Sequence, residues 1–225
     1  MKKLWDKLAK KNSKYFINSD YGQNITEKDF NKSGWEDYFK LIHRDRILNK
    51  FFNEDIKPSE RVRGKGSTIL DLGCGTGRLT FNMPEDFYWT IGTDISGEMI
   101  KQANDWLVPE NLDTIKFLET DGYTLPLGDN LVDVAFSYLV FQHMRTKEMV
   151  ESNFKEVFRV LKPGGIFKVR IRTDEVRQDK WWSGVAYTEQ SIGLLIKKMG
   201  YEILKTEAVE DYGLWLWLKK PIDMK

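Results

Sequence analysis

The 225-residue chain fits one large domain, and its hydrophobic content of 41% is enough to fill a core beneath a charged surface. Because 35 basic residues nearly cancel 34 acidic ones, no general positive field exists to hold a polyphosphate backbone, which disfavours nucleic acid as a partner. One cysteine and two histidines exclude a disulfide framework and a Cys/His zinc site, so we expect no metal centre. We find no signal peptide or membrane-length apolar segment, and we expect a cytoplasmic monomer or homodimer.

Residues 1–57 are polar and aromatic, and we expect them to form a helical lid or substrate-cover region over the main domain. The first of these helices carries Leu4, Trp5 and Leu8 at helical spacing among many lysines. It reads as an amphipathic helix with a solvated charged face, with membrane contact as the alternative. Further apolar residues recur near helical spacing: Trp35, Phe39, Ile42, Ile47 and Phe51. A linker at Pro58–Ser67 opens the main domain, residues 58–225.

In the main domain, short apolar runs alternate with helical stretches, which predicts parallel strands joined by right-handed crossovers. The helical stretches are Gly97–Leu107 and Thr146–Leu161. The strand-like runs are Thr68–Leu72, Tyr88–Thr93, Ile115–Glu119, Leu131–Ser137 and Gly165–Ile171. After a helix that ends near Met199, two more runs, Tyr201–Ala208 and Leu214–Lys219, predict an antiparallel hairpin. The expected fold is α/β and doubly wound (Rossmann-like), with a mostly parallel seven-stranded sheet.

A glycine-rich turn follows the first strand, where open α/β sheets bind their ligands. Its sequence is Asp71-Leu72-Gly73-Cys74-Gly75-Thr76-Gly77, whose glycines permit positive φ and let a ligand lie against the backbone. A tight connection with no ligand is the alternative. Asp94 ends the second strand, where an acidic side chain can accept hydrogen bonds from ribose hydroxyls. Together the turn and Asp94 predict a nucleoside site.

Two details argue against a dinucleotide. The dinucleotide fingerprint requires its third glycine where this chain has Arg78, because Gly77 comes one residue early. Asp71 precedes the glycines, and its charge would repel a pyrophosphate but attract an ammonium or sulfonium group. The cofactor should therefore carry positive charge.

At this point the chain resembles the class I S-adenosylmethionine-dependent methyltransferases. The resemblance rests on motifs that occur in the family's order: Ile69–Gly77, Gly92–Ser96, Glu119–Gly122, Asp133–Ser137 and Arg159–Gly165. It covers about residues 65–220 and would make residues 58–225 a methyltransferase domain. It also implies S-adenosylmethionine as cofactor and S-adenosylhomocysteine as product.

The resemblance also implies roles for individual residues. The backbone around Gly73 and Gly75 would lie against the methionine part of the cofactor, with Asp71 near its ammonium group. Asp94 would bind the ribose hydroxyls. The remaining implied contacts are Ile95 on the adenine face, Asp121 and Gly122 at the adenine amine, and Ser137 beneath the sulfonium.

Each of these residues also has a structural interpretation. Asp94 is placed to cap the next helix, although Ser96 is better placed for that role. Asp121 is equally compatible with a turn. Cys74 reads as a small buried filler, because no base is implied beside it.

His143 is the candidate general base, because it follows the fourth strand on the side where the acceptor would enter. The alternative is a histidine that packs against or caps the next helix, and we expect His43 to be structural. Trp181 and Trp182 lie in a loop after the fifth strand, and Tyr21 lies in the N-terminal region. These aromatic residues are candidates to cover the acceptor, with core packing as the alternative.

The leading functional hypothesis is methyl transfer to an oxygen or nitrogen atom of a small polar metabolite, such as a sugar or a biosynthetic intermediate. The alternatives are an NAD(P)-dependent oxidoreductase, which would share the sheet and the ribose-binding acid, and a non-catalytic S-adenosylmethionine-binding protein.

Overall fold

The computed structural model describes residues 1–52, 66–109, 113–173, 184–209 and 213–222. The strands form a seven-stranded sheet in the order β3-β2-β1-β4-β5-β7-β6. The pairs β1–β2, β2–β3 and β4–β5 are parallel, and β7 is antiparallel to both β5 and β6. The predicted doubly wound sheet with its closing hairpin is therefore confirmed. The chain divides into two compact units, Met1–Asp121 and Gly122–Lys225.

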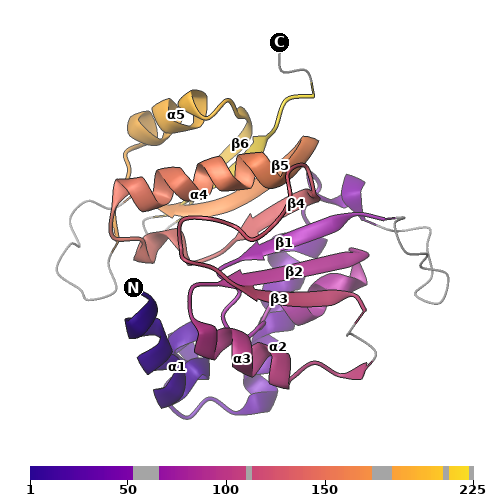
Figure 1. The fold of residues 1–225 in the computed structure, drawn as a ribbon, viewed down its shortest axis with the longest axis vertical. Helices are drawn as coiled ribbons and strands as arrows, with labels where there is room; N and C mark the ends of the chain where they lie inside the picture. Colours follow the sequence, from indigo (N-terminus) through magenta and orange to yellow (C-terminus); the bar gives the residue numbers. More distant parts are fainter. Residues whose placement is uncertain (53–65, 110–112, 174–183, 210–212, 223–225) are drawn as a thin grey trace. The chain divides into compact units, whose positions relative to one another are not determined.

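In the first unit, three strands carry the N-terminal half of the sheet (Figure 1). They are β1 (Thr68–Leu72), β2 (Trp89–Asp94) and β3 (Ile115–Glu119). A short 3-10 helix with a proline inside it, η5 (Thr80–Glu85), lies between β1 and β2. Between β2 and β3 lies α3 (Gly97–Asp105), whose N-terminus is capped by Ser96, where the hydroxyl accepts from the Met99 N–H at 3.2 Å. The prediction that Ser96 caps this helix is confirmed.

The N-terminal region of the same unit is helical. It begins with α1 (Lys2–Ile17), which contacts α3 and lies beside it in Figure 1. Inside α1, Asn12 leaves the helical conformation with a φ of −171°, and its Oδ1 accepts a hydrogen bond from the Tyr15 N–H at 3.1 Å. Four short segments follow: η1 (Ser19–Tyr21), α2 (Glu27–Tyr38), the π-helix η2 (Phe39–His43) and η3 (Asn49–Phe51).

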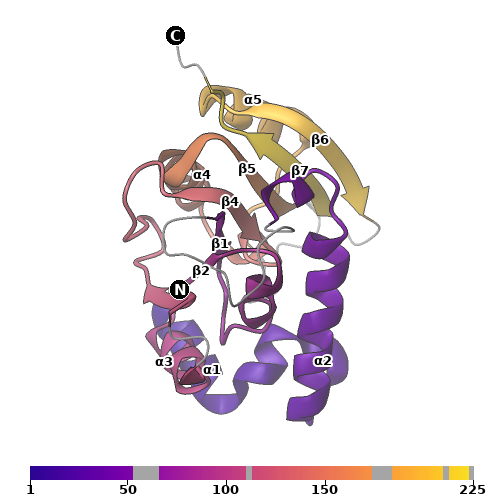
Figure 2. The same ribbon diagram turned by 90° about the vertical axis from the view of Figure 1, so that its right-hand side faces the viewer.

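The second unit contains the other four strands: β4 (Val132–Ser137), β5 (Leu161–Arg172), β6 (Glu202–Val209) and β7 (Gly213–Lys219). Its helices are η7 (Phe141–His143), α4 (Lys147–Val160) and α5 (Glu189–Lys198). Figure 1 shows α4 and α5 on one face of these strands, and Figure 2 shows the β6–β7 hairpin at their edge. Edge-to-face contacts of Phe154 with Phe141 and Phe167, at centroid distances of 5.4 and 5.5 Å, pack α4 onto β5.

One boundary differs from the sequence prediction. We expected a helix through Leu161 and a strand from Gly165, but α4 ends at Val160 and β5 begins at Leu161. Leu161 pairs with Val132, and the register then shifts before Val134 pairs with Ile166. The extra residues form an irregular stretch in which Gly164 has a φ of 82°, a conformation that suits glycine.

No helix in the described part of the chain is both long enough and apolar enough to cross a bilayer.

Candidate functional site

The glycine loop follows β1 and is hydrogen-bonded to the end of β2. Three of its residues have positive φ: Gly73 at 82°, Gly75 at 58° and Gly77 at 86°. Side chains at such positions would be strained, so the sequence requires glycine there. The backbone N–H groups of Gly73 and Cys74 both donate to the Thr93 carbonyl, at 2.7 and 3.0 Å. These backbone hydrogen bonds attach the loop to the end of β2.

The floor of the loop is a compact apolar cluster. Cys74 is buried there with Ile100, Ala103, Ile115 and Phe117. Burial raises the pKa of the Cys74 thiol well above its ordinary value, which disfavours the reactive thiolate. The interpretation of Cys74 as a buried filler agrees with this environment.

Asp94 lies at the end of β2, directly beside the loop. Its Oδ2 accepts from the Gly75 N–H at 3.0 Å, and its Oδ1 accepts from the Ser96 N–H at 2.8 Å. Burial raises the pKa of the Asp94 carboxyl, and backbone hydrogen bonds from Ser96, Gly75 and Ile95 oppose that rise. A carboxylate has about four acceptor positions, so a position remains for a hydroxyl donor. The geometry fits a ribose hydroxyl.

Asp71 is a buried carboxyl at the end of β1. Its Oδ2 accepts from the Thr80 hydroxyl at 2.6 Å. Burial raises its pKa to about 6, and no ion pair with Asp71 is formed among the residues that the structure describes. The nearby Arg78 instead pairs with Asp37 at 2.7 Å. A positively charged ligand group beside Asp71 would stabilise its ionised form.

The end of β3 continues the same edge. The Thr120 N–H donates to the Asp94 carbonyl at 2.9 Å, and the exposed Asp121 follows Thr120. Ile95 directly follows β2, and its carbonyl lies 3.5 Å from Nζ of Lys2. The first unit therefore brings together the glycine loop, Asp71, Asp94, Ile95 and the approach to Asp121.

The N-terminal helix α1 covers part of this edge. Oδ1 of Asp6 accepts from the Ser96 hydroxyl at 2.7 Å and from the Glu98 N–H at 3.3 Å, at the start of α3. Lys2 forms an ion pair with Glu119 at the end of β3. At the other end of α1, Ile17 lies over the loop, and a Cβ added to Gly75 would be 2.9 Å from its Cδ1. Tyr21 lies four residues beyond α1 and is 47% exposed.

His43 lies in an aromatic stack with Phe39 and Phe52. Its ring stacks on Phe39 at a centroid distance of 4.9 Å, and its Nδ1 lies 3.0 Å from Oδ2 of Asp86. The same carboxylate accepts a hydrogen bond from the buried Tyr38 hydroxyl. These contacts agree with the structural role expected for His43.

The second unit holds the other candidates. Ser137 is fully buried at the end of β4, and Gly122 begins the unit with a φ of 83°. His143 is half-buried in η7, where its backbone N–H donates to the Val140 carbonyl at 2.9 Å. Between Ser137 and His143, Leu139 has a φ of 59°, which is costly for a bulky side chain. That Gly122, Ser137 and His143 join the site in the first unit stays a prediction.

Trp181 and Trp182 lie outside the described residues. Across the ranges that the structure covers, no group of three or more His, Cys, Asp or Glu side chains is arranged to hold a metal ion.

Residues 70–169, which run from β1 into β5, match the methyltransferase domain family. The match includes the glycine loop, Asp94 and Asp121. This part of the chain is thus similar to methyltransferase domains.

Curated methyltransferases share parts of this chain. A tRNA (carboxymethyluridine(34)-5-O)-methyltransferase of Arabidopsis thaliana is 32% identical over 68% of this chain and 39% of its own length. A demethylmenaquinone methyltransferase of Lactococcus lactis is 37% identical over 64% of this chain and 60% of its own length. The chain thus spans less than two thirds of the length of either relative.

Solved methyltransferase structures share the fold. A crystal structure of an S-adenosylmethionine-dependent methyltransferase from Methanosarcina mazei matches with a TM-score of 0.61 at 20% identity, over 80% of this chain and 99% of that one. At this identity the likeness concerns the fold alone.

Two features of this site were not predicted. Gly92 is one of them: a Cβ there would lie 2.6 Å from the Phe117 ring and 2.9 Å from Sγ of Cys74, so the floor of the loop requires glycine on β2 as well. Gly92 pairs with Asp71 in the sheet. The sequence alone does not give this register between β1 and β2, so the requirement for glycine could not be predicted. The other is the set of contacts that α1 makes with α3, which depends on residues about 90 positions apart in sequence.

Proposed function

We propose that this protein transfers a methyl group from S-adenosylmethionine to an oxygen or nitrogen atom of a small polar metabolite. The observation that carries the proposal is the buried Asp71 carboxyl beside a loop of positive-φ glycines, without a protein cation paired to it within the described ranges. Such a site favours a cofactor that carries an ammonium group and can lie flat against backbone. S-adenosylmethionine meets both requirements, whereas a pyrophosphate would be repelled.

The residues present fit this cofactor. Asp71 would hold its ammonium group, Gly73 and Gly75 its methionine part, and Asp94 its ribose hydroxyls. The remaining contacts would come from Ile95, Asp121, Gly122 and Ser137, with Cys74 and Gly77 shaping the loop. When bound, the cofactor supplies the methyl group on its sulfonium. The protein has to align the acceptor with that methyl group, and alignment of this kind accounts for a large share of the barrier reduction in group transfer.

Isothermal titration calorimetry with S-adenosylmethionine, S-adenosylhomocysteine and NAD tests the cofactor assignment. We expect both sulfur compounds to bind at micromolar or tighter Kd and NAD not to bind. Binding of NAD alone would overturn the assignment in favour of an oxidoreductase.

The acceptor assignment is supported by the charge balance, with 35 basic against 34 acidic residues. A small polar molecule needs no extended positive surface, whereas an RNA does. The relatives include proteins named as methyltransferases of tRNA, of demethylmenaquinone and of phosphoethanolamine, so these classes belong in the test. A methyl-transfer assay with labelled cofactor should cover sugars, biosynthetic amines, quinols and tRNA. Turnover on a small polar compound is the expected result.

Two other outcomes of that assay would contradict the proposal. Turnover on tRNA alone would replace the small acceptor with a nucleic acid. Cofactor binding without turnover on any acceptor in the panel would favour a non-catalytic binding protein.

We also propose that residues 1–57 act as a lid on the cofactor and help to cover the acceptor. The contacts of Asp6 with Ser96 and of Ile17 with the Gly75 position support this role. Tyr21, Trp181 and Trp182 would then face the acceptor. Hydrogen exchange on the whole chain tests the lid: S-adenosylhomocysteine should slow exchange of the α1 amides, and exchange rates unchanged by ligand would reject it. In addition, we propose a cytoplasmic protein that acts as a monomer or homodimer.

A further inference from the structure

Polar side chains on one face of helix α4 contact the loop that follows Gly122. These are Ser152, Asn153, Glu156 and Arg159, which recur at the spacing that places residues on one face of a helix. Most of their hydrogen bonds to the loop go to backbone groups. A polar helix face would ordinarily be read as solvated, yet here it binds a loop.

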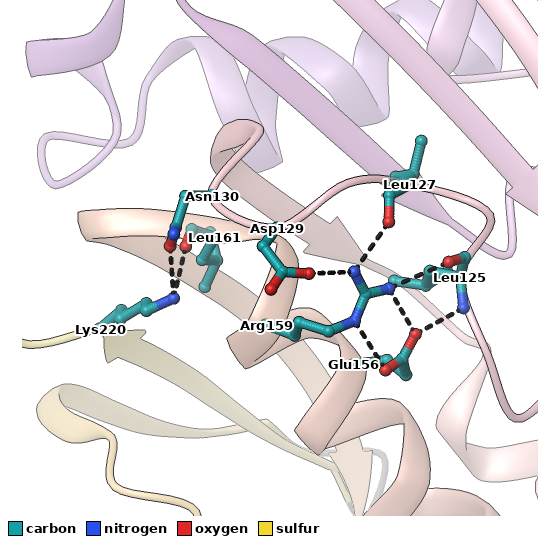
Figure 3. A network of polar contacts seen from close by, with 8 residues as sticks. All are labelled: Leu125, Leu127, Asp129, Asn130, Glu156, Arg159, Leu161 and Lys220. Carbon is teal, nitrogen blue, oxygen red and sulfur yellow. Dashed lines mark hydrogen bonds and ion pairs between the residues drawn. The ribbon is translucent and has the colours of Figure 1, made fainter.

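Arg159 and Glu156 hold the far part of the loop (Figure 3). The Arg159 guanidinium donates to the Leu125 carbonyl at 3.0 Å and to the Leu127 carbonyl at 2.8 Å. Glu156 accepts from the Leu125 N–H at 2.8 Å and pairs with Arg159 at 2.7 Å. The hydrogen bonds from Arg159 lower the pKa of Glu156, so the carboxylate stays charged and the loop backbone is clamped between two opposite charges.

Asn153 holds the near end of the loop, at Gly122. Its Nδ2 donates to the Gly122 carbonyl at 2.8 Å and to the Met149 carbonyl at 2.8 Å. The amide group has two N–H donors, so both are used. Asn153 is only 4% exposed, and water therefore does not readily replace the bond to Gly122.

Gly122 needs such an anchor because its φ of 83° lies outside the range of a strand. The residue before it, Asp121, is exposed and stands at the end of the first unit. On the other side of Asp121, Thr120 is tied to Asp94 by the 2.9 Å backbone bond. The direction of the Asp121 side chain thus depends on two anchored neighbours, of which Gly122 is held by a side chain.

We propose that Asn153 is a positioning residue for adenine recognition. It fixes the Gly122 carbonyl, and with it the Asp121–Gly122 peptide, so that Asp121 meets the exocyclic amine of the adenine ring. The proposal rests on the proposed binding of S-adenosylmethionine, in which Asp121 is the adenine partner. It adds a residue of α4 that does not touch the cofactor but determines which base the site accepts.

Binding measurements with a matched pair of ligands test this role. The ligands are S-adenosylhomocysteine and S-inosylhomocysteine, which differ in the group at position 6 of the purine: an amine in one, an oxo group in the other. The variants are Asn153→Ala and Asn153→Ser, in the full chain. Serine keeps a donor for the Met149 carbonyl within its own helix but is too short to replace the amide at Gly122. Ser152→Ala is the control, because it removes only the neighbouring bond to the Tyr123 carbonyl.

The wild-type protein should prefer the adenine ligand by about tenfold or more, as sites built around one hydrogen bond to a charged group do. In both Asn153 variants the preference should fall below about threefold, mainly through weaker binding of S-adenosylhomocysteine. Ser152→Ala should keep the wild-type ratio. A loss of folded protein alone would weaken both ligands equally and leave the ratio unchanged, so the ratio separates positioning from stability.

A wild-type ratio in folded Asn153 variants would overturn the proposal and leave the proposed function intact. Failure of the wild-type protein to bind either ligand would instead overturn the proposed function, and this role with it.

Discussion

The backbone N–H of Gly75 donates a 3.0 Å hydrogen bond to Oδ2 of Asp94, so the glycine loop and the acid at the end of β2 are parts of one structure. We predict that Asp94→Ala weakens binding of S-adenosylhomocysteine by about 1–3 kcal/mol, because the ribose loses hydrogen bonds to a charged group. The loop also loses its acceptor, so the variant should have faster amide exchange at Gly75. Calorimetry and hydrogen exchange measure the two effects.

The matched control is Asp105→Ala, which removes an exposed acid from the end of α3. Its affinity should equal that of the wild type. Equal affinity of Asp94→Ala and wild type would remove Asp94 from the cofactor site.

The second prediction concerns stability without cofactor. Burial raises the pKa of Asp71 to about 6 from an ordinary value of 3.8. A raised folded pKa gives stability that is present below pH 3.8 and is lost as the pH rises through 6. Asp71→Asn keeps an acceptor for Thr80 and removes the buried charge, so at pH 7 it should raise the free energy of unfolding by about 3 kcal/mol, from roughly two pKa units at 1.36 kcal/mol each.

Urea unfolding of the cofactor-free protein at pH 4 and pH 7 measures this effect. The gain should shrink to below about 1 kcal/mol at pH 4, where the folded wild-type carboxyl is protonated and the unfolded one is only partly ionised. If Asp71→Asn is less stable than wild type at pH 7, the ionised Asp71 carboxylate does not destabilise the folded protein, and the prediction is wrong.

The third prediction is that cofactor affinity falls as the pH drops below 6. An ammonium group beside Asp71 stabilises the carboxylate, so the bound state has a lower Asp71 pKa than the free state, and binding must release a proton below pH 6. Affinity for S-adenosylhomocysteine should decrease by up to about tenfold per pH unit there. In Asp71→Asn the slope should be smaller, with only the raised pKa of Asp94 left to contribute. An undiminished slope in the variant would assign the titration to another group.

The sheet could be predicted from the sequence because each strand is a short apolar run between polar turns or helices. The hairpin followed from two such runs around a charged turn, and the N-terminal cap of α3 followed from Ser96 before the Gly97-Glu98 pair. These features depend on neighbouring residues only. The glycine loop was predictable for the same reason, because the residues with positive φ are themselves glycines.

Features that depend on distant residues were not predictable. Trp35 occurs among apolar residues at helical spacing, a pattern typical of a buried helix face, but it is 49% exposed and stacks on Phe39 at 4.9 Å. Asn153 and Arg159 read as the solvated face of a helix until the loop beside them is known. Hydrogen bonding of this kind leaves no periodic signal, because one polar residue in the right place is enough.

The fourth prediction uses the contact between Ile17 and the glycine loop. Gly75→Ala would place a Cβ 2.9 Å from Cδ1 of Ile17 at a φ of 58°. The clash and the left-handed backbone together should cost about 2–3 kcal/mol of unfolding free energy. In the Ile17→Ala background, the same substitution should cost only the backbone part, about 1–2 kcal/mol. Strictly additive effects in this double-mutant cycle would show that α1 does not lie on the loop in solution.

The fifth prediction concerns His143, for which the structure offers a matched control in the only other histidine of the chain, His43. If the acceptor is a hydroxyl or a protonated amine, its proton must leave, and a histidine is suited to accept it near neutral pH. His143→Ala should then lower kcat by about 10²–10⁴-fold, with cofactor affinity within about twofold of wild type. It should also abolish the acidic limb of the pH–rate profile. His43→Ala should keep that limb, because His43 is held by Asp86 and Phe39 in the N-terminal stack. An acidic limb that persists in His143→Ala would show that transfer needs no base at this position, and the residue would then serve to hold η7 at the end of β4.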